Sequence, residues 1–174
     1  YQNDFSDSLA LEHFIIARHL SSEKEYAKAI IEYNNALKIE NNNNIALSDL
    51  MLAYFYNDDI ENTLLIGKDL LVMFPDDAVV KSQLGHIYFY IGEYDNSLEI
   101  LNQAIDLCPT CGHAYWNRGL TKTKLNFSAC EICQDFTKGL KLMREKQTEE
   151  VNNIEQTRYK QNIEFMKKYC DACE

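Results

Sequence analysis

The sequence predicts an all-α protein, a right-handed α-solenoid of about four helix-turn-helix repeats with a C-terminal capping helix. Three observations lead to this prediction. Apolar residues recur at the three- and four-residue spacing of amphipathic helices, and a pattern repeats every 34 residues. The chain of 174 residues also contains only six glycines and two prolines. Because these two residues most destabilise helix interiors, their scarcity agrees with a mostly helical chain.

Residues 78–111 form the clearest repeat. Apolar residues at helical spacing occupy both halves of this segment. The run from Gly92 to Asp95 separates the halves, and Pro109 follows the second. Turn residues between two periodic segments, with a proline after the second, predict a helix, a tight turn, a second helix and a stop.

A shift of 34 residues brings the sequence into register with itself. It carries Tyr54-Phe55-Tyr56 onto Tyr88-Phe89-Tyr90, and Pro75 onto Pro109. The same shift gives two further columns of small or apolar residues: Ala17, Met51, Gly85 and Gly119, and Ala36, Leu70 and Ala104. Agreement of several columns at one period predicts a stack of equivalent helix pairs.

With these motifs the sequence resembles the tetratricopeptide repeat (TPR) family over residues 10–143. The resemblance implies four repeats, at about 10–43, 44–77, 78–111 and 112–144, after a leader segment at 1–9. The second half of the last repeat matches only if one residue is added in the turn near Asn126.

Residues 145–174 are expected to form the capping helix and a Cys-x-x-Cys tail. Sparse apolar positions predict a helix that covers the last core face with one side and meets water with the other. These positions are Val151, Ile154, Ile163, Phe165, Met166 and Tyr169.

The function predicted from the resemblance is that of a protein–protein interaction scaffold or adaptor. In TPR arrays the first helix of each repeat lines a concave groove, and residues at i, i+4 and i+8 on these helices form stripes beside the core positions. Aromatic rings beside serines and a histidine suit an extended peptide or a partner helix. The residues predicted to face the groove are Phe14, Arg18, Ser48, Leu52, Tyr56, Ser82, His86, Tyr90, Trp116, Leu120 and Lys124. The alternative interpretation is that the aromatic residues among them only pack between helices.

The six cysteines form three Cys-x-x-Cys pairs: Cys108/Cys111, Cys130/Cys133 and Cys170/Cys173. If the capping helix folds back antiparallel on the last repeat, the second and third pairs lie side by side, because the two helices have similar lengths. Four sulfurs there could form two disulfides or one tetrahedral zinc site, and free thiols are the third possibility.

The first pair looks locally like a zinc knuckle and like a redox motif. Because it closes a helix instead of opening one after a strand, a local disulfide or free thiols are favoured over catalysis. The alternative function is a thiol-redox or zinc-binding protein that uses the scaffold to present its cysteine pairs.

Charge and motif content disfavour several other classes of function. The net charge of −10 opposes binding to nucleic acid and to anionic membranes, and no apolar run approaches the roughly 20 residues that span a bilayer. No phosphate-binding glycine loop, nucleophile elbow or paired-histidine zinc helix occurs, so neither enzyme activity nor a cofactor other than zinc is predicted. The even cysteine count and the start at Tyr1 favour an exported or periplasmic protein with disulfides; the alternative is a cytoplasmic protein.

Overall fold

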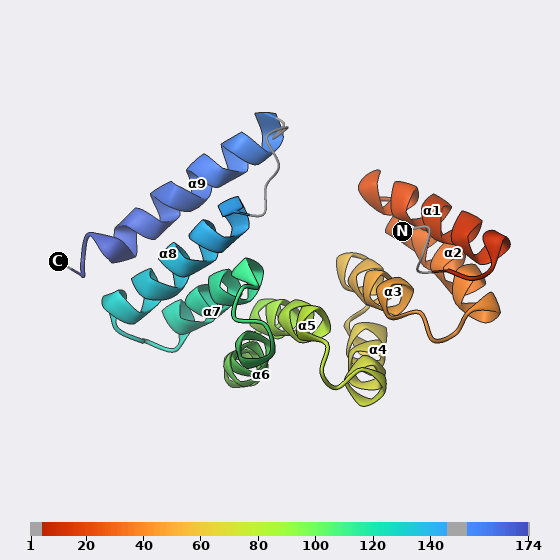
Figure 1. Cartoon of the computed structure of the whole chain (residues 1–174), viewed down its shortest axis with the longest axis horizontal. Coiled ribbons are helices and arrows are strands. Elements are labelled where there is room, and N and C mark those ends of the chain that lie inside the picture. Colours follow the sequence, from red (N-terminus) through yellow and green to blue (C-terminus); the bar gives the residue numbers. More distant parts are fainter. Residues whose placement is uncertain (1–4, 146–152, 174) are drawn as a thin grey trace. The chain divides into compact units, whose positions relative to one another are not determined.

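A computed structural model describes the backbone of residues 5–145 and 153–173, and the side chains of 5–145 and 160–173. These residues form α-helices and connecting turns, without strands, as Figure 1 shows. The helices are α1 (Ser8–Ser22), α2 (Tyr26–Ile39), α3 (Asn44–Tyr56), α4 (Ile60–Met73), α5 (Ala78–Tyr90), α6 (Tyr94–Leu107), α7 (Gly112–Lys124), α8 (Ala129–Glu145) and α9 (Asn153–Cys170). The all-α prediction is therefore confirmed. Within the described residues, no helix is both long and apolar enough to cross a membrane.

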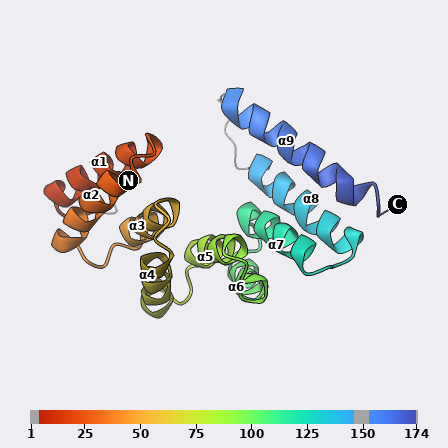
Figure 2. The same ribbon diagram turned by 180° about the vertical axis from the view of Figure 1, so that it is seen from behind.

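The helices belong to two compact units, which meet in the sequence between Asp76 and Asp77. The first unit contains α1 to α4 and the second contains α5 to α9. Within each unit every helix packs against the next one along the chain, which can be followed from both sides in Figures 1 and 2. This sequential pairing confirms the predicted helix-turn-helix design. The predicted repeat boundaries and the leader segment stay predictions.

The turn inside each helix pair contains one residue in the left-handed conformation. These residues lie 34 positions apart: Lys24 (φ 63°), Asp58 (φ 61°), Gly92 (φ 86°) and Asn126 (φ 58°). The second helix begins two residues after this position in the first three pairs, but three residues after it in the fourth, where α8 begins at Ala129. The additional residue predicted near Asn126 is therefore confirmed, and it lies between the left-handed residue and the helix.

The repeating columns of the sequence are core positions. Ala36, Leu70 and Ala104 are fully buried. Gly85 must be small because a Cβ atom there would lie 2.5 Å from Cγ of Leu101, which belongs to the partner helix α6. The period thus reflects a repeated packing contact between the two helices of a pair.

The helix α9 packs against α8, as expected of a capping helix. The ring of Phe136 on α8 lies 5.6 Å from the Phe165 ring and 5.8 Å from the Tyr169 ring, both on α9. These contacts cover the apolar side of the last helix pair. Val151 and Ile154, which were predicted to lie on the apolar side of the capping helix, lie outside the residues whose side chains the structure describes.

Candidate functional site

A cavity of about 250 Å³ opens in the first unit between α1, α2 and α3. Three of its lining residues, Arg18, Leu52 and Tyr56, were predicted from the sequence to face a groove. Arg18 comes from α1, whereas Leu52 and Tyr56 lie one turn apart on α3, where the four-residue spacing places them on one face. The structure therefore brings part of two predicted stripes to a single concave site.

An ion pair forms one side of this cavity. Nε of Arg18 lies 3.5 Å from Oδ2 of Asp49, and the two side chains are 41% and 23% exposed. Burial raises the pKa of the Asp49 carboxyl, and the guanidinium of Arg18 acts in the opposite direction. The guanidinium also lies 5.7 Å from the centroid of the Phe14 ring, at cation–π distance. The cavity thus offers a positioned cationic donor beside a carboxylate.

Two stacked tyrosine rings form another side. The rings of Tyr26, at the start of α2, and Tyr56, at the end of α3, have centroids 5.3 Å apart and an interplanar angle of 24°. The ring of Phe55 meets Tyr56 edge-on, with centroids 5.3 Å apart. Tyr56 is 50% exposed, so these neighbours orient its ring while one side stays open to solvent. Such an ordered aromatic surface contributes contact area at little cost in side-chain entropy.

Tyr33 on α2 also lines the cavity. The Tyr33 side chain is buried, and its oxygen lies 3.4 Å from Oγ of Ser21. Burial raises the pKa of Tyr33 to about 12, and the contact with Ser21 opposes this change. The hydroxyl therefore stays protonated at ordinary pH, and both hydroxyl groups can donate or accept hydrogen bonds.

Three residues predicted to face the groove are instead buried. Phe14 is 1% exposed, and its ring packs 4.9 Å from Phe5 and 6.0 Å from Tyr33 in the core of the first unit. Ser48 and Ser82 are 6% and 7% exposed. At these three positions the side chains of the predicted stripes are buried against neighbouring parts of the protein instead of facing solvent. These three positions are therefore corrected from surface to core.

Trp116 packs against the last two helices of the second unit. Its ring lies 4.6 Å from the Phe136 ring of α8 and 6.4 Å from the Phe165 ring of α9, so the capping helix covers much of it. Leu120, one turn further along α7, is partly buried, and Lys124 at the helix end is exposed. Trp116 therefore contributes to the packing of the last helix pair.

The stripe on α5 has an accessible end. The rings of His86 and Tyr90 meet edge-on with centroids 4.7 Å apart, and Tyr90 is 61% exposed. This pair occupies the positions in the second unit that Leu52 and Tyr56 occupy in the first.

The contribution of α2 to the cavity was not predicted from the sequence. Only first helices were expected to contribute, so Tyr26 and Tyr33 were not candidates, and Asp49 was not recognised as the partner of Arg18. A signal was present, because an aromatic residue at the start of the second helix recurs as Tyr94 in the third helix pair. There the Tyr94 ring approaches Phe89, at 5.8 Å between centroids.

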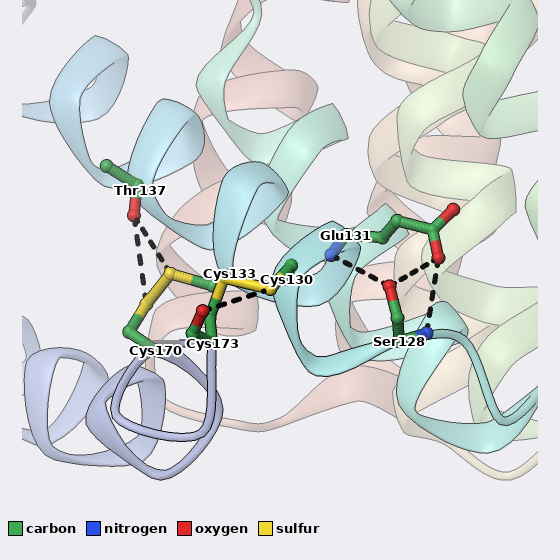
Figure 3. The surroundings of a disulfide bond; sticks show 7 residues. All are labelled: Ser128, Cys130, Glu131, Cys133, Thr137, Cys170 and Cys173. Atoms are coloured by element: carbon green, nitrogen blue, oxygen red, sulfur yellow. Dashed lines mark hydrogen bonds between the residues drawn. A yellow bond between two sulfur atoms is a disulfide. The ribbon is translucent and has the colours of Figure 1, made fainter.

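The second and third cysteine pairs form two disulfides that join α8 to the end of α9. Cys130 pairs with Cys173 and Cys133 pairs with Cys170, with Cα atoms 4.7 Å and 4.9 Å apart. Figure 3 shows the two bridges side by side, with the Thr137 hydroxyl beside the second. The disulfide alternative is therefore the one that the structure adopts. Among the described residues, no cluster of three or more potential ligands is arranged to hold a metal ion.

A capping box fixes the start of α8, next to these bridges. The Glu131 carboxylate accepts hydrogen bonds from Oγ of Ser128, at 2.6 Å, and from the Ser128 amide, at 3.2 Å, while the Glu131 amide donates to Oγ of Ser128 at 3.3 Å (Figure 3). The bonds from Ser128 lower the pKa of Glu131. Because the helix start is fixed, Cys130 and Cys133 are held on the side that faces α9.

The first cysteine pair forms a local disulfide. It joins Cys108, which ends α6, to Cys111, which precedes α7, and the Cα atoms are 5.4 Å apart. This agrees with the local disulfide favoured from the sequence.

Comparisons with known proteins agree on the type of fold. Residues 85–126 match the family model described as TPR repeat. No curated protein matches the chain in sequence. Among solved structures, a thermophilic TPR protein from Thermus thermophilus is similar over 76% of this chain and 74% of its own, with 19% identity and a TM-score of 0.70.

Two further solved structures resemble the chain to a similar degree. MamA from Desulfovibrio magneticus RS-1 matches 97% of this chain and 89% of its own, at 17% identity and a TM-score of 0.68. PilF from Pseudomonas aeruginosa matches 79% of this chain and 63% of its own, at 17% identity and a TM-score of 0.71. At such identities the likeness concerns the fold.

Proposed function

We propose that this chain, which has the fold of tetratricopeptide repeat proteins and matches the TPR repeat model at residues 85–126, is a protein–protein interaction scaffold that binds a peptide segment in the cavity of its first unit. Proteins of this fold typically mediate protein–protein interactions and usually are not enzymes. The observation that carries the proposal is the convergence of Arg18, Leu52 and Tyr56 at one concave site.

The size and chemistry of the cavity define the segment that fits it. At about 250 Å³ it is smaller than the roughly 300–1,000 Å³ of typical sites for drug-sized ligands. It therefore suits one large side chain and the adjoining backbone. The Tyr56 ring and Leu52 favour an apolar or aromatic side chain, and the hydroxyls and the Arg18–Asp49 pair supply donors and acceptors for the polar backbone beside it.

The exposed part of the α5 stripe supports a second contact surface. His86 and Tyr90 present an ordered aromatic pair at the end of α5. We infer that this pair, together with Lys124 at the end of α7, is a separate contact surface of the second unit for a peptide or a partner helix. Nucleic acid is a poor alternative partner because of the net charge of −10.

The three disulfides support an oxidising compartment. Disulfides persist in exported proteins and in the bacterial periplasm, whereas cytosolic thiols are kept reduced. We therefore favour an exported or periplasmic location over the cytoplasmic alternative.

Peptide selection followed by affinity measurement tests the proposal. Random peptides displayed on phage are selected against the full oxidised chain, and the best sequence is titrated by calorimetry. We expect Tyr56→Ala to weaken binding by about 2 kcal/mol, about 30-fold in Kd, because it removes the exposed ring of the cavity. Helix content should stay unchanged, since half of the ring is already in solvent.

Val72→Ala is the matched control. Val72 lies on α4 in the same unit, is 82% exposed and does not line the cavity. Its replacement removes an exposed apolar side chain and should leave the affinity unchanged. Equal affinities of the parent, Tyr56→Ala and Val72→Ala for every selected peptide would refute the proposed site.

A further inference from the structure

The disulfide turn between α6 and α7 has two counterparts at earlier positions of the repeat. The three turns begin at Glu40, Phe74 and Cys108 and end at Asn43, Asp77 and Cys111. At the first residue of the turn, φ and ψ are −125° and 91° for Glu40, −133° and 64° for Phe74, and −136° and 83° for Cys108. At the last residue, φ and ψ are −83° and 107° for Asn43, −84° and 103° for Asp77, and −81° and 87° for Cys111. The same turn thus forms twice without a disulfide, so the Cys108–Cys111 bond is not needed to shape it.

The last residue of each turn is also the N-cap of the next helix. The Asn43 side chain accepts a hydrogen bond from the Ala46 amide at 2.9 Å, and the Asp77 carboxylate accepts from the amides of Val79 and Val80 at 2.8 Å and 3.1 Å. Cys111 caps α7 without a side-chain hydrogen bond while its sulfur is in the disulfide.

Opening the disulfide would change this cap. A Cys111 thiolate would stand where the Asp77 carboxylate stands before α5, and helix amides stabilise a thiolate there as they stabilise a carboxylate. The turn therefore holds one sulfur that is a good leaving group in thiol–disulfide exchange.

The two sulfurs differ in their surroundings. Cys111 packs against the core cluster that contains Leu101, Ala104 and Ala114. Cys108 is half-buried like Cys111, but its Sγ lies 3.8 Å from the hydroxyl of the exposed Thr110 instead of against the core. An incoming group therefore reaches Cys108 more easily than Cys111, and attack there makes Cys111 the leaving sulfur.

We propose that the Cys108–Cys111 disulfide is a thiol–disulfide exchange site that oxidises cysteine thiols of a peptide. The thiolate of the incoming cysteine attacks Sγ of Cys108. The bond between the two sulfurs breaks, and its electron pair passes to Cys111, which becomes a thiolate at the start of α7. A second peptide thiolate then attacks the incoming sulfur and releases Cys108. Two peptide thiols become one disulfide, and their two protons and two electrons reduce the cysteine pair to two thiols.

The other two disulfides have a different role. They join residues 43 and 37 positions apart and hold α9 to α8, whereas Cys108 and Cys111 are 3 positions apart. Long closed loops restrict the unfolded chain most strongly. The Cys130–Cys173 and Cys133–Cys170 disulfides therefore stabilise the packing of the capping helix, whereas the Cys108–Cys111 disulfide is the one that we assign to thiol–disulfide exchange.

Glutathione, a small cysteinyl peptide, provides the first test. The oxidised full chain is incubated with reduced glutathione and quenched in acid. The free thiols are then alkylated, and the modified cysteines are located by mass spectrometry. We expect the Cys108–Cys111 bond to open at least about ten-fold faster than the other two, with the transient glutathione adduct on Cys108. Opening no faster than the other two disulfides, or an adduct mainly on Cys111, would overturn the proposal.

A variant that copies the turn before α5 provides the control. Cys108→Phe together with Cys111→Asp reproduces Phe74 and Asp77, so the turn and the cap are retained without the disulfide. This variant should melt no lower than the oxidised parent and should form no glutathione adduct between residues 108 and 111. A melting temperature well below that of the parent would assign the disulfide a structural role and contradict the proposal.

Discussion

The two units are built from the same repeated helix pair but are stabilised by different means. All six cysteines lie beyond Asp77, so every disulfide belongs to the second unit. The first unit has a core of aromatic and small side chains, in which Phe14 and Tyr33 are buried among alanines, and it contains the open cavity. Covalent bonds therefore brace one unit, whereas the other offers a concave surface.

The charged residues show the same contrast. In the second unit Asp135 is 4% exposed and accepts hydrogen bonds from Nε and Nη2 of Arg118 at 2.9 Å and 2.6 Å, while Nζ of Lys122 lies 2.8 Å from Oδ2 of the same carboxylate. This network joins α7 to α8. The Arg18–Asp49 pair of the first unit is more exposed and opens into the cavity. Charges thus serve internal packing in one unit and remain accessible to a ligand in the other.

The largest expected effect comes from removing the bridges to α9. Replacing Cys170 and Cys173 with Ser opens both long loops, and the chain-entropy relation gives roughly 4 kcal/mol for a loop of the length closed by Cys130 and Cys173. The oxidised variant should therefore melt well below the oxidised parent in a circular dichroism experiment. In reductant the difference should nearly vanish. If the variant melts with the parent under both conditions, the apolar contacts of α9 hold the helix unaided.

The architecture and the cysteine contacts were predictable because they depend on regular spacing. A period of 34 residues follows from one repeated contact, such as the buried column of Ala36, Leu70 and Ala104. The approach of Cys130 and Cys133 to the final pair followed from two antiparallel helices of similar length. Which sulfur pairs with which, and whether metal was bound instead, depended on side-chain geometry that spacing does not specify.

The cavity was only partly predictable, for a physical reason. Spacing shows which residues share a helix face, but not how deeply a neighbouring helix buries that face. Phe14 and Ser48 were therefore placed on the surface although they lie in the core. Tyr26 was overlooked because its role depends on stacking with Tyr56, 30 positions away on another helix.

A smaller effect is expected from the turns that both units share. Lys24 adopts φ of 63° at the position where the second unit has Gly92 with φ of 86°. A left-handed conformation costs a residue with a Cβ atom roughly 1–2 kcal/mol, which replacement by glycine would remove. The greater conformational freedom of glycine in the unfolded chain offsets part of this stabilisation. Lys24→Gly should therefore stabilise the first unit by about 0.5–1 kcal/mol in urea denaturation followed by helicity. Gly92→Ala is the matched reverse change and should be destabilising. If Lys24→Gly instead lowers the free energy of unfolding, the contacts of the Lys24 side chain stabilise the protein by more than its left-handed backbone conformation costs.

The most direct measurement is a hydrogen-exchange footprint of the selected peptide on the full oxidised chain. If the first unit is the binding unit and the second is the braced one, saturating peptide should slow exchange in the segments of α1 to α3 that contain Arg18, Tyr26 and Tyr56. The segments around Trp116 and Phe136 should exchange at the same rate with and without peptide. Slower exchange confined to α7 and α8, with no change around Arg18 and Tyr56, would contradict this assignment.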